Sequence, residues 1–349
     1  MLGARAALEA AIRPCLIQAP CVIGFSGGRD SSALLALAAG LAAREGWEEP
    51  VPVTLRFPFP ETQETRWQEL AMSQLGLSSW VRVDCEDELD LIGSLAARGL
   101  RDHGVQYPPN IHLVARLADH AAGGSVLTGT GGDDAFGAWP WYRLFAVAAR
   151  RVRPRPRDAR TAAHALAPAW LRREYLRRRR PLLLPWLRAD PRRAVAQRTA
   201  ADLVARPRSW SARMEWLAGS RLWRAAAFSA AQLGADRGVM VRSPLIDPGY
   251  LRALGREGAR HGWGDRTATT RALFGDLLPA ELIERSTKAT FSGPFFGPCT
   301  RAFARSWDGG GLDPAVYDPE ELRTVWQSAQ PHFGSAMALQ SAWLAGDTG

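Results

Sequence analysis

Residues 21–36 read CVIGFSGGRDSSALLA and join a strand-like segment to a helix-like one. The apolar run that ends at Phe25 is typical of a buried strand, and the Ala- and Leu-rich segment 31–44 is typical of a helix. Between them lies the glycine-rich turn 26–30. This order places the amino end of the helix, with its unpaired N–H groups, at the turn. The stretch therefore predicts an anion-binding loop.

The turn carries the groups that a pyrophosphate would need. Its glycines allow a sharp bend and present backbone amides, while neighbouring hydroxyls add further donors. The expected phosphate-binding residues are Ser26, Gly27, Gly28, Ser31 and Ser32. Asp30 adds a carboxylate where a phosphate-bound Mg²⁺ would need an oxygen ligand.

Two other glycine motifs compete for this stretch. Residues 24–28 also spell G-x-S-x-G, the nucleophile elbow of α/β-hydrolases, with Ser26 as the nucleophile. That elbow follows several strands, whereas only about 20 residues precede this one and they form a single helix-like segment, so we exclude it. The chain also has no G-x-x-x-x-G-K-[ST] sequence, which excludes a P-loop NTPase.

The composition is that of an ordinary globular protein. The 349 residues are 46% hydrophobic and 23% charged, enough for a large core in two closely packed parts. No apolar run is long enough to span a membrane, and residues 1–14 resemble a surface helix, not a signal peptide. The four cysteines form no C-x-x-C pair and the six histidines show no metal-ligand spacing. We expect a reduced, cytoplasmic protein.

Strand-like and helix-like segments alternate through the first part of the chain. Further strands are expected at 51–56, 80–84 and 125–128, with helices at 62–75, 89–103 and 111–122. This alternation predicts an α/β fold with a parallel sheet, in which ligands bind beyond the carboxyl ends of the strands. From Trp139 onward strand signals fade. We therefore divide the chain into an α/β part, 1–145, and a mostly helical part, 146–349.

A second glycine-rich loop, TGTGGDDAFG at 128–137, follows the last of these strands. Its glycines, Gly131 among them, again present amides to a ligand. Asp133 supplies a second hard oxygen ligand for Mg²⁺. An ion that bridges polyphosphate oxygens is commonly held by carboxylates from separate loops, so the two loops together predict a metal–polyphosphate site.

The motif Ser-Gly-Gly-x-Asp-Ser resembles the signature of the N-type ATP pyrophosphatases, the PP-loop enzymes. With the second loop it is similar to the synthetase domain of asparagine synthetase and its relatives, the β-lactam synthetases and the lasso-peptide cyclases. Two downstream segments extend the likeness: 241–247 is similar to R-x-P-[FL]-[LI]-D, and 284–292 to R-x-x-K-x-x-F-S. The resemblance runs from about residue 18 to the C-terminus.

This resemblance implies a PP-loop sheet, ATP and Mg²⁺ as cofactors, and a two-step reaction. In the family a substrate carboxylate attacks the α-phosphate of ATP, pyrophosphate leaves, and an amine takes the acyl-adenylate to give an amide. The strand residues Val53 and Leu55 would contact adenine through their backbone. Lys288 falls where the family has a lysine that contacts the phosphate and the tetrahedral intermediate. It is the single lysine among 44 basic residues.

The departures from the family pattern concern the amine. Asparagine synthetases carry Glu at the position of Thr130, and β-lactam synthetases carry Tyr. A threonine is a poor proton acceptor near neutral pH, so the catalytic role of Thr130 and the identity of the base stay open. Leu2 stands where asparagine synthetases have a catalytic cysteine, and we find no glutaminase domain. We expect the amine to come from a partner protein, free ammonia or the substrate itself, and do not expect asparagine as product.

We therefore expect an ATP-dependent, AMP-forming amide synthetase that acts on a peptide, in a lasso-type macrolactam, or on a specialised small molecule. Segment 143–193 holds 16 arginines against three acidic residues. It could dock an acidic leader peptide or a partner protein. Because arginine replaces lysine almost everywhere in this chain, a solvated basic face is an equally good interpretation.

Two alternatives remain at this point. A tRNA-modifying PP-loop enzyme would use the basic segment on phosphates, but the second loop, segment 284–292 and the lack of a cysteine pair argue against it. The second alternative is a non-catalytic subunit that only binds nucleotide. It stays possible because Thr130 replaces the family's expected base. We expect neither a nucleic-acid partner nor a membrane.

Overall fold

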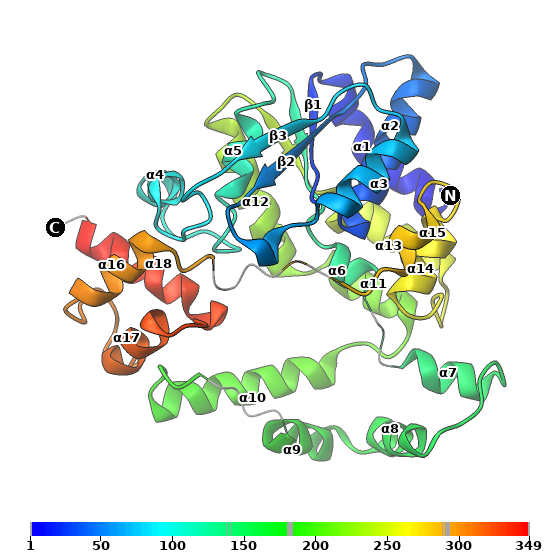
Figure 1. Cartoon of the computed structure of the whole chain (residues 1–349). Helices are drawn as coiled ribbons and strands as arrows, with labels where there is room; N and C mark the ends of the chain where they lie inside the picture. The colour runs from blue at the N-terminus through cyan, green and yellow to red at the C-terminus, as the bar shows by residue number, and fades with distance from the viewer. Residues whose placement is uncertain are drawn as a thin grey trace.

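A computed structural model describes residues 2–137, 139, 141–179, 184–287, 289 and 294–347, and within these residues one five-stranded sheet forms (Figure 1). Its strands are β1 (Cys21–Gly24), β2 (Val51–Arg56), β3 (Val81–Asp84), β4 (Ser125–Leu127) and β5 (Met240–Arg242). All neighbours pair in parallel, in the order β3-β2-β1-β4-β5. The predicted α/β fold with a parallel sheet and a mostly helical second half is confirmed.

The fifth strand was not predicted. It lies more than 100 residues beyond β4, in the part of the chain where strand signals fade, and it pairs with β4 through Val126 and Val241. A strand of three residues shows no alternating pattern of its own, and β5, unlike the equally short β4, is not part of the regular alternation of strand-like and helix-like segments. The second half of the chain therefore completes the sheet that the first half begins.

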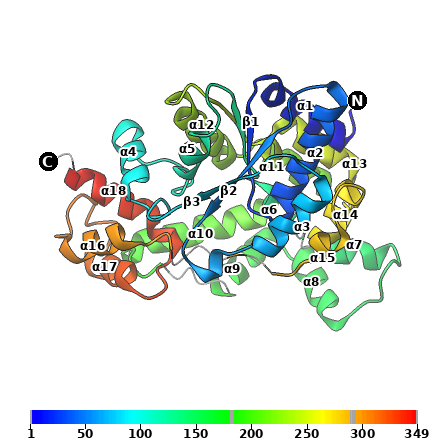
Figure 2. The same cartoon turned by 45° about the horizontal axis from the view of Figure 1, so that its top comes forward.

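Alternate strand residues feed two hydrophobic clusters, one on each face of the sheet. Ile23 and Phe25 point into one cluster, and Val22 points into the other. The first face is covered by α1 (Ala4–Ile17), α2 (Arg29–Glu45), α3 (Thr65–Leu75) and α13 (Pro248–Glu257). The second is covered by α4 (Ser94–His103), α5 (Leu113–Ala118) and α12 (Arg221–Ala235). Figure 2 shows the sheet between these two groups.

The first helix is more deeply packed than its sequence suggested. Leu8 and Ile12 of α1 are fully buried in the first cluster, so one side of this helix belongs to the core. Its other side carries Arg13, which pairs with Glu45 of α2 at 2.9 Å. The helix is amphipathic and lies along the edge of the sheet.

Most of the Arg-rich segment forms an extended helical arm, which runs along the lower side of the molecule in Figure 1. The arm consists of α7 (Tyr142–Ala148), α8 (Pro156–Leu166), α9 (Ala169–Arg179) and α10 (Ala189–Ala205). Residues 180–183 lie outside the described part of the chain. Many arm side chains are exposed, including Trp170 at 70%.

The remaining elements return to the body of the molecule. They are α11 (Trp210–Ala218), α14 (Arg266–Phe274), α15 (Ala280–Glu284), α16 (Pro298–Ser306), α17 (Pro319–Gln327) and α18 (Ala336–Asp347). Shorter turns are α6 (Gly132–Ala135), η1 (Pro60–Thr62), η2 (Pro244–Ile246) and η3 (Phe333–Ser335). Among the described residues, no helix combines the length and the apolar character needed to cross a membrane.

Candidate active site

The sheet brings the two glycine-rich loops into contact. The first loop follows β1 and the second follows β4, and these strands are neighbours whose carboxyl ends share one edge. A Cβ atom added to Gly132 would lie 2.2 Å from the carboxylate of Asp30. Only glycine allows the second loop to come this close, so the spacing of the two loops is built into the sequence.

The first loop is shaped by its own serines. Gly27 has φ +77°, which favours glycine, and Ser26 Oγ accepts a hydrogen bond from the Gly28 amide at 3.3 Å. Ser31 Oγ accepts from the Ser26 amide at 3.3 Å and donates to the Gly28 carbonyl at 3.1 Å. These contacts set the turn directly before the amino end of α2, whose dipole favours an anion there.

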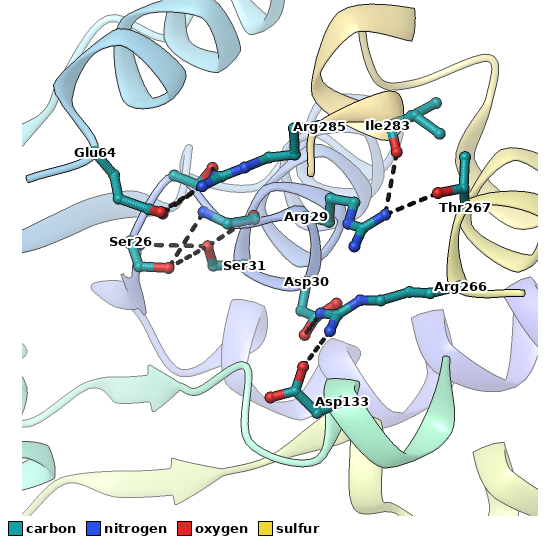
Figure 3. A network of polar contacts seen from close by, with 12 residues as sticks. Ser26, Arg29, Asp30, Ser31, Glu64, Asp133, Arg266, Thr267, Ile283 and Arg285 are labelled. Carbon is teal, nitrogen blue, oxygen red and sulfur yellow. Dashed lines mark hydrogen bonds and ion pairs between the residues drawn. The ribbon is translucent and has the colours of Figure 1, made fainter. Parts of the chain in front are cut away.

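A buried ion pair between Arg285 and Glu64 stabilises the first loop. Arg285 Nη1 donates to the Gly27 carbonyl at 2.8 Å and to Glu64 Oε2 at 3.1 Å. The Arg285 side chain also lies over the ring of Trp67 (Figure 3 shows the ion pair). The family-like segment that begins at 284 is thereby tied to the first loop. Sequence reasoning missed Glu64, because no local pattern reveals its partner.

Arg266, at the amino end of α14, connects the two predicted metal ligands. Its Nη2 donates to Asp30 Oδ2 at 2.6 Å, and its Nη1 donates to Asp133 (Figure 3). Burial by itself would lower the pKa of Arg266, but the two carboxylates raise it above its usual value. The guanidinium is therefore firmly charged, and the two carboxylates converge on one point.

This arrangement bears on the predicted Mg²⁺. Within the described part of the chain, no cluster of three or more His, Cys, Asp or Glu side chains could hold a metal. Mg²⁺ is, however, commonly bound by one or two carboxylates together with substrate phosphates. Asp30 and Asp133 fit an ion of that kind, which binds with the nucleotide, provided that Arg266 moves aside.

A cavity of about 470 Å³ opens where the loops meet. Its walls include six of the predicted site residues: Ser26, Gly28, Asp30, Ser31, Leu55 and Thr130. Five others do not line it within the described residues: Gly27, Ser32, Val53, Gly131 and Asp133. Ser32 and Val53 are buried inside the fold. Lys288 lies outside the described residues, so its place in the site remains a prediction.

The walls of the cavity are rich in positive charge. Arg29, Arg266 and Arg285 all line it, against the carboxylates of Asp30 and Glu64. Arg29 is held by Thr267 Oγ1 at 3.1 Å and by a backbone carbonyl of α15. Guanidinium groups suit phosphate oxygens in charge and geometry, so the cavity fits a polyphosphate.

The second loop contains a chain of three hydroxyls. Thr128 Oγ1 donates to Thr130 Oγ1 at 3.0 Å and lies 2.8 Å from Ser243 Oγ. Since Thr128 has one hydroxyl hydrogen, Ser243 must be the donor in the second bond. The hydrogen of Thr130 is then available to an acceptor in the cavity. In this geometry the Thr130 hydroxyl can donate a hydrogen bond to a ligand.

The segment 241–247 supports the second loop. Asp247 caps α13 by accepting a hydrogen bond from the Tyr250 amide at 2.9 Å. The η2 turn before it is buried, and a Cβ added to Gly131 would lie 2.0 Å from Ile246 Cγ2. Sequence reasoning recognised this segment as family-like but did not predict that Ser243 joins the hydroxyl chain.

A family model described as asparagine synthase matches residues 3–345. The chain belongs to the asparagine synthase family. The family match extends the resemblance, expected from about residue 18, to nearly the whole chain. This family consists of ATP-dependent synthetases that form amide bonds, which agrees with the polyphosphate cavity. A search of curated proteins finds no match.

Proposed function

We propose that this member of the asparagine synthase family adenylates a substrate carboxylate and joins the acyl group to an amine. The observation that carries the proposal is the meeting of both glycine-rich loops at one cavity lined by three arginines. ATP would bind there, with its phosphates at the first loop and its adenine towards Leu55 of β2.

In the first step a carboxylate oxygen attacks the α-phosphorus of ATP, and the bond to the β,γ-phosphates breaks. The departing pyrophosphate gains charge, which the amino end of α2 and the side chains of Arg29 and Arg266 stabilise. Asp30 and Asp133 would hold a Mg²⁺ ion, which when bound neutralises charge on the leaving group. The products of this step are an acyl-adenylate and pyrophosphate.

In the second step an amine attacks the acyl carbon, AMP leaves, and the nitrogen loses a proton. Negative charge develops on the acyl oxygen as the tetrahedral intermediate forms. The hydroxyl of Thr130, oriented by Thr128, faces the cavity as a donor to such an oxygen. Lys288 is our candidate for a second cationic stabiliser at the same stage.

The proposed substrate is a peptide or a specialised small molecule, and a lasso-type macrolactam is the preferred product. Such a reaction takes the amine and the carboxylate from one chain. Thr130 supports a product other than asparagine, because asparagine synthetases carry Glu at this position. We also propose a cytoplasmic location, since all four cysteines are free and burial raises the pKa of the Cys15 thiol to about 12.

The helical arm is our candidate for the docking of an acidic leader peptide or a partner protein. Trp170, Arg173 and Arg177 share a groove between α9 and α10. Glu174 neutralises part of this charge through its pairs with Arg177 at 2.7 Å and Arg178 at 2.6 Å. Exposed tryptophan beside arginine is typical of protein-binding surfaces.

The test of the proposed function is the identity of the spent nucleotide. Purified protein is incubated with ATP, Mg²⁺ and candidate carboxylate peptides, and the nucleotides are separated by chromatography. We expect AMP and pyrophosphate, with peptide-dependent exchange of labelled pyrophosphate into ATP. ADP as the main product would contradict the assignment. A salt-sensitive gel shift with tRNA, together with failed exchange, would favour the tRNA-modifying alternative.

A further inference from the structure

A second cavity, of about 570 Å³, runs along the outer edge of the sheet. We call it the edge slot, and its floor is β5 together with the residues on either side, 239–244. One wall comes from α1 and the other from α12. Alanines such as Ala11 and Ala227 form much of both walls, and their small side chains leave the slot open. The slot belongs to neither of the glycine-rich loops.

The floor of the slot is the free edge of a strand. Within the described residues β5 is the last strand of the sheet and pairs only with β4. The Met240 amide donates to Gly124, and the Arg242 carbonyl accepts from Thr128, both at 3.0 Å. Because bonding directions alternate along a strand, the amide and carbonyl of Val241 face the opposite way, towards the slot. An extended peptide is the ligand that such an edge accepts.

The side chains around this edge indicate what the peptide carries. Val241, Met240 and the alanines offer an apolar surface to alternate side chains. Arg224 and Arg242 also line the slot, and neither has an ion-pair partner among the described residues. Asp247 also lines the slot, and its carboxylate accepts a hydrogen bond from the Tyr250 amide as the cap of α13. The two guanidiniums outnumber this one carboxylate and complement an extended segment with acidic side chains.

The slot shares a wall with the nucleotide cavity. Ser243 lines the slot, Thr130 lines the nucleotide cavity, and Thr128 joins their hydroxyls. Ile246, also in the slot wall, packs against Gly131 of the second loop. The slot and the nucleotide cavity are therefore linked through Thr128 and the second loop.

We propose that the edge slot binds an extended peptide segment with acidic side chains, added as a further strand beside β5. The proposal rests on the proposed function only in making this peptide the substrate of the amide synthetase. Binding itself needs neither ATP nor catalysis, and it can be measured without them.

The test uses two pools of acetylated heptapeptides. Both have Ala, Val, Leu or Ile at random at five positions, and the other two positions are Glu in one pool and Gln in the other. Each pool is incubated with the nucleotide-free protein, and retained peptides are counted by mass spectrometry after ultrafiltration. We expect the Glu pool to be retained about tenfold better, the ratio for the loss of one charge-assisted contact. Hydrogen exchange at 239–243 should slow when the Glu pool binds.

Matched variants locate the binding. Ala227→Trp fills the slot and should abolish retention, whereas Ala225→Trp, an exposed residue of the same helix outside the slot, should leave it unchanged. Arg224→Gln should remove the preference for Glu, and Arg221→Gln serves as its control. If Ala227→Trp does not fold, the comparison of Arg224→Gln with its control Arg221→Gln is sufficient to test the proposal.

Three outcomes would overturn the proposal: no retention of either pool, equal retention of both, or unchanged retention in Ala227→Trp and Arg224→Gln. Pyrophosphate exchange is measured separately on the same samples. Peptide retention without exchange activity would leave the slot in place and refute the proposed function. Pyrophosphate exchange without peptide retention would support the proposed function and refute peptide binding in the edge slot.

Discussion

The two glycine-rich loops follow adjacent strands and meet at one cavity, yet they lead into different structures. The first precedes α2, a helix of 17 residues with much of its length buried. The second precedes α6, which has four residues. A long helix brings a substantial dipole and a row of aligned amides to its amino end, and a single turn brings little. The first loop is therefore better suited than the second to hold phosphates, and the predicted contact of Gly131 with the nucleotide stays a prediction.

The hydrogen bonds that stabilise the two loops also differ. The first is fixed by its own serines and by Arg285 on its carbonyl side. The second is fixed by a hydroxyl chain that leaves the Thr130 hydrogen directed at the cavity. The carboxylates of the two loops come together on Arg266. On this comparison we expect the first loop to bind pyrophosphate, the second to serve acyl transfer, and both to contribute a ligand to the proposed Mg²⁺.

The largest loss of activity is expected when one of the two carboxylates that would bind Mg²⁺ is removed. Asp30→Asn and Asp133→Asn should each abolish adenylation without unfolding the protein, since each removes a charged ligand of the ion. The measurement is ATP–pyrophosphate exchange, and Asp134→Asn, the neighbouring carboxylate, is the control. Near-normal exchange in Asp133→Asn would break the comparison, because the second loop would then be only a turn.

Lys288→Arg should separate the two steps. Arginine keeps the charge but spreads it over a broad plane, so contact with a single oxygen is lost. We expect amide formation to fall by about 10²–10³, as for the loss of one oxyanion donor, while ATP still binds. Product is quantified by mass spectrometry and ATP binding by calorimetry. Wild-type product rates would leave the amide step without its proposed cation.

Thr130→Val should have a smaller effect on the same step. The variant keeps the shape of the side chain and removes one hydroxyl donor, which corresponds to about a tenfold loss of amide formation. Pyrophosphate exchange should stay normal, because the first loop is unchanged. Ser26→Ala is the matched comparison in the first loop, and it should affect exchange. If Thr130→Val lowers exchange and amide formation equally, the loops do not divide the steps.

The smallest effect is expected for the helical arm. Arg177→Gln combined with Arg178→Gln should leave the chemistry on a small surrogate substrate unchanged. Both side chains are partly exposed and share Glu174, so we expect about a two- to fivefold weaker affinity for an acidic peptide. Calorimetry at two salt concentrations measures it. Unchanged affinity would make the arm a solvated surface.

The sequence allowed prediction of the elements whose signals are local. Strands β1 to β4 carry short apolar runs that alternate with helix-like segments, and they lie close to where they were expected. Both β4 and β5 have three residues, but β5 follows a long helical region and was missed because it has no such alternation around it. Its neighbour Ser243 lies in a segment recognised as family-like, but its bond to Thr128 spans 115 positions.

The rest of the site could not be predicted for the same reason. The pairs of Arg266 with Asp30 and of Arg285 with Glu64 each join residues more than 200 positions apart. Such pairs are set by the tertiary packing that brings Arg266 and Arg285 to the first loop, which no local pattern encodes. The sequence identified the two carboxylates as candidates and could not show what lies between them.

Because Arg266 already bridges Asp30 and Asp133, a divalent cation that binds these carboxylates would replace the guanidinium as their counter-ion. Asp30, Asp133 and Arg266 together carry one net negative charge. If Asp30 and Asp133 hold the proposed Mg²⁺ in place of the guanidinium, both carboxylates would keep a cationic partner, and the permanent positive charge of Arg266 would be released at the wall of the cavity. The phosphates of an arriving nucleotide would then meet two cations where the protein alone held one. Binding of the metal would therefore also increase the electrostatic attraction of the site for the polyphosphate.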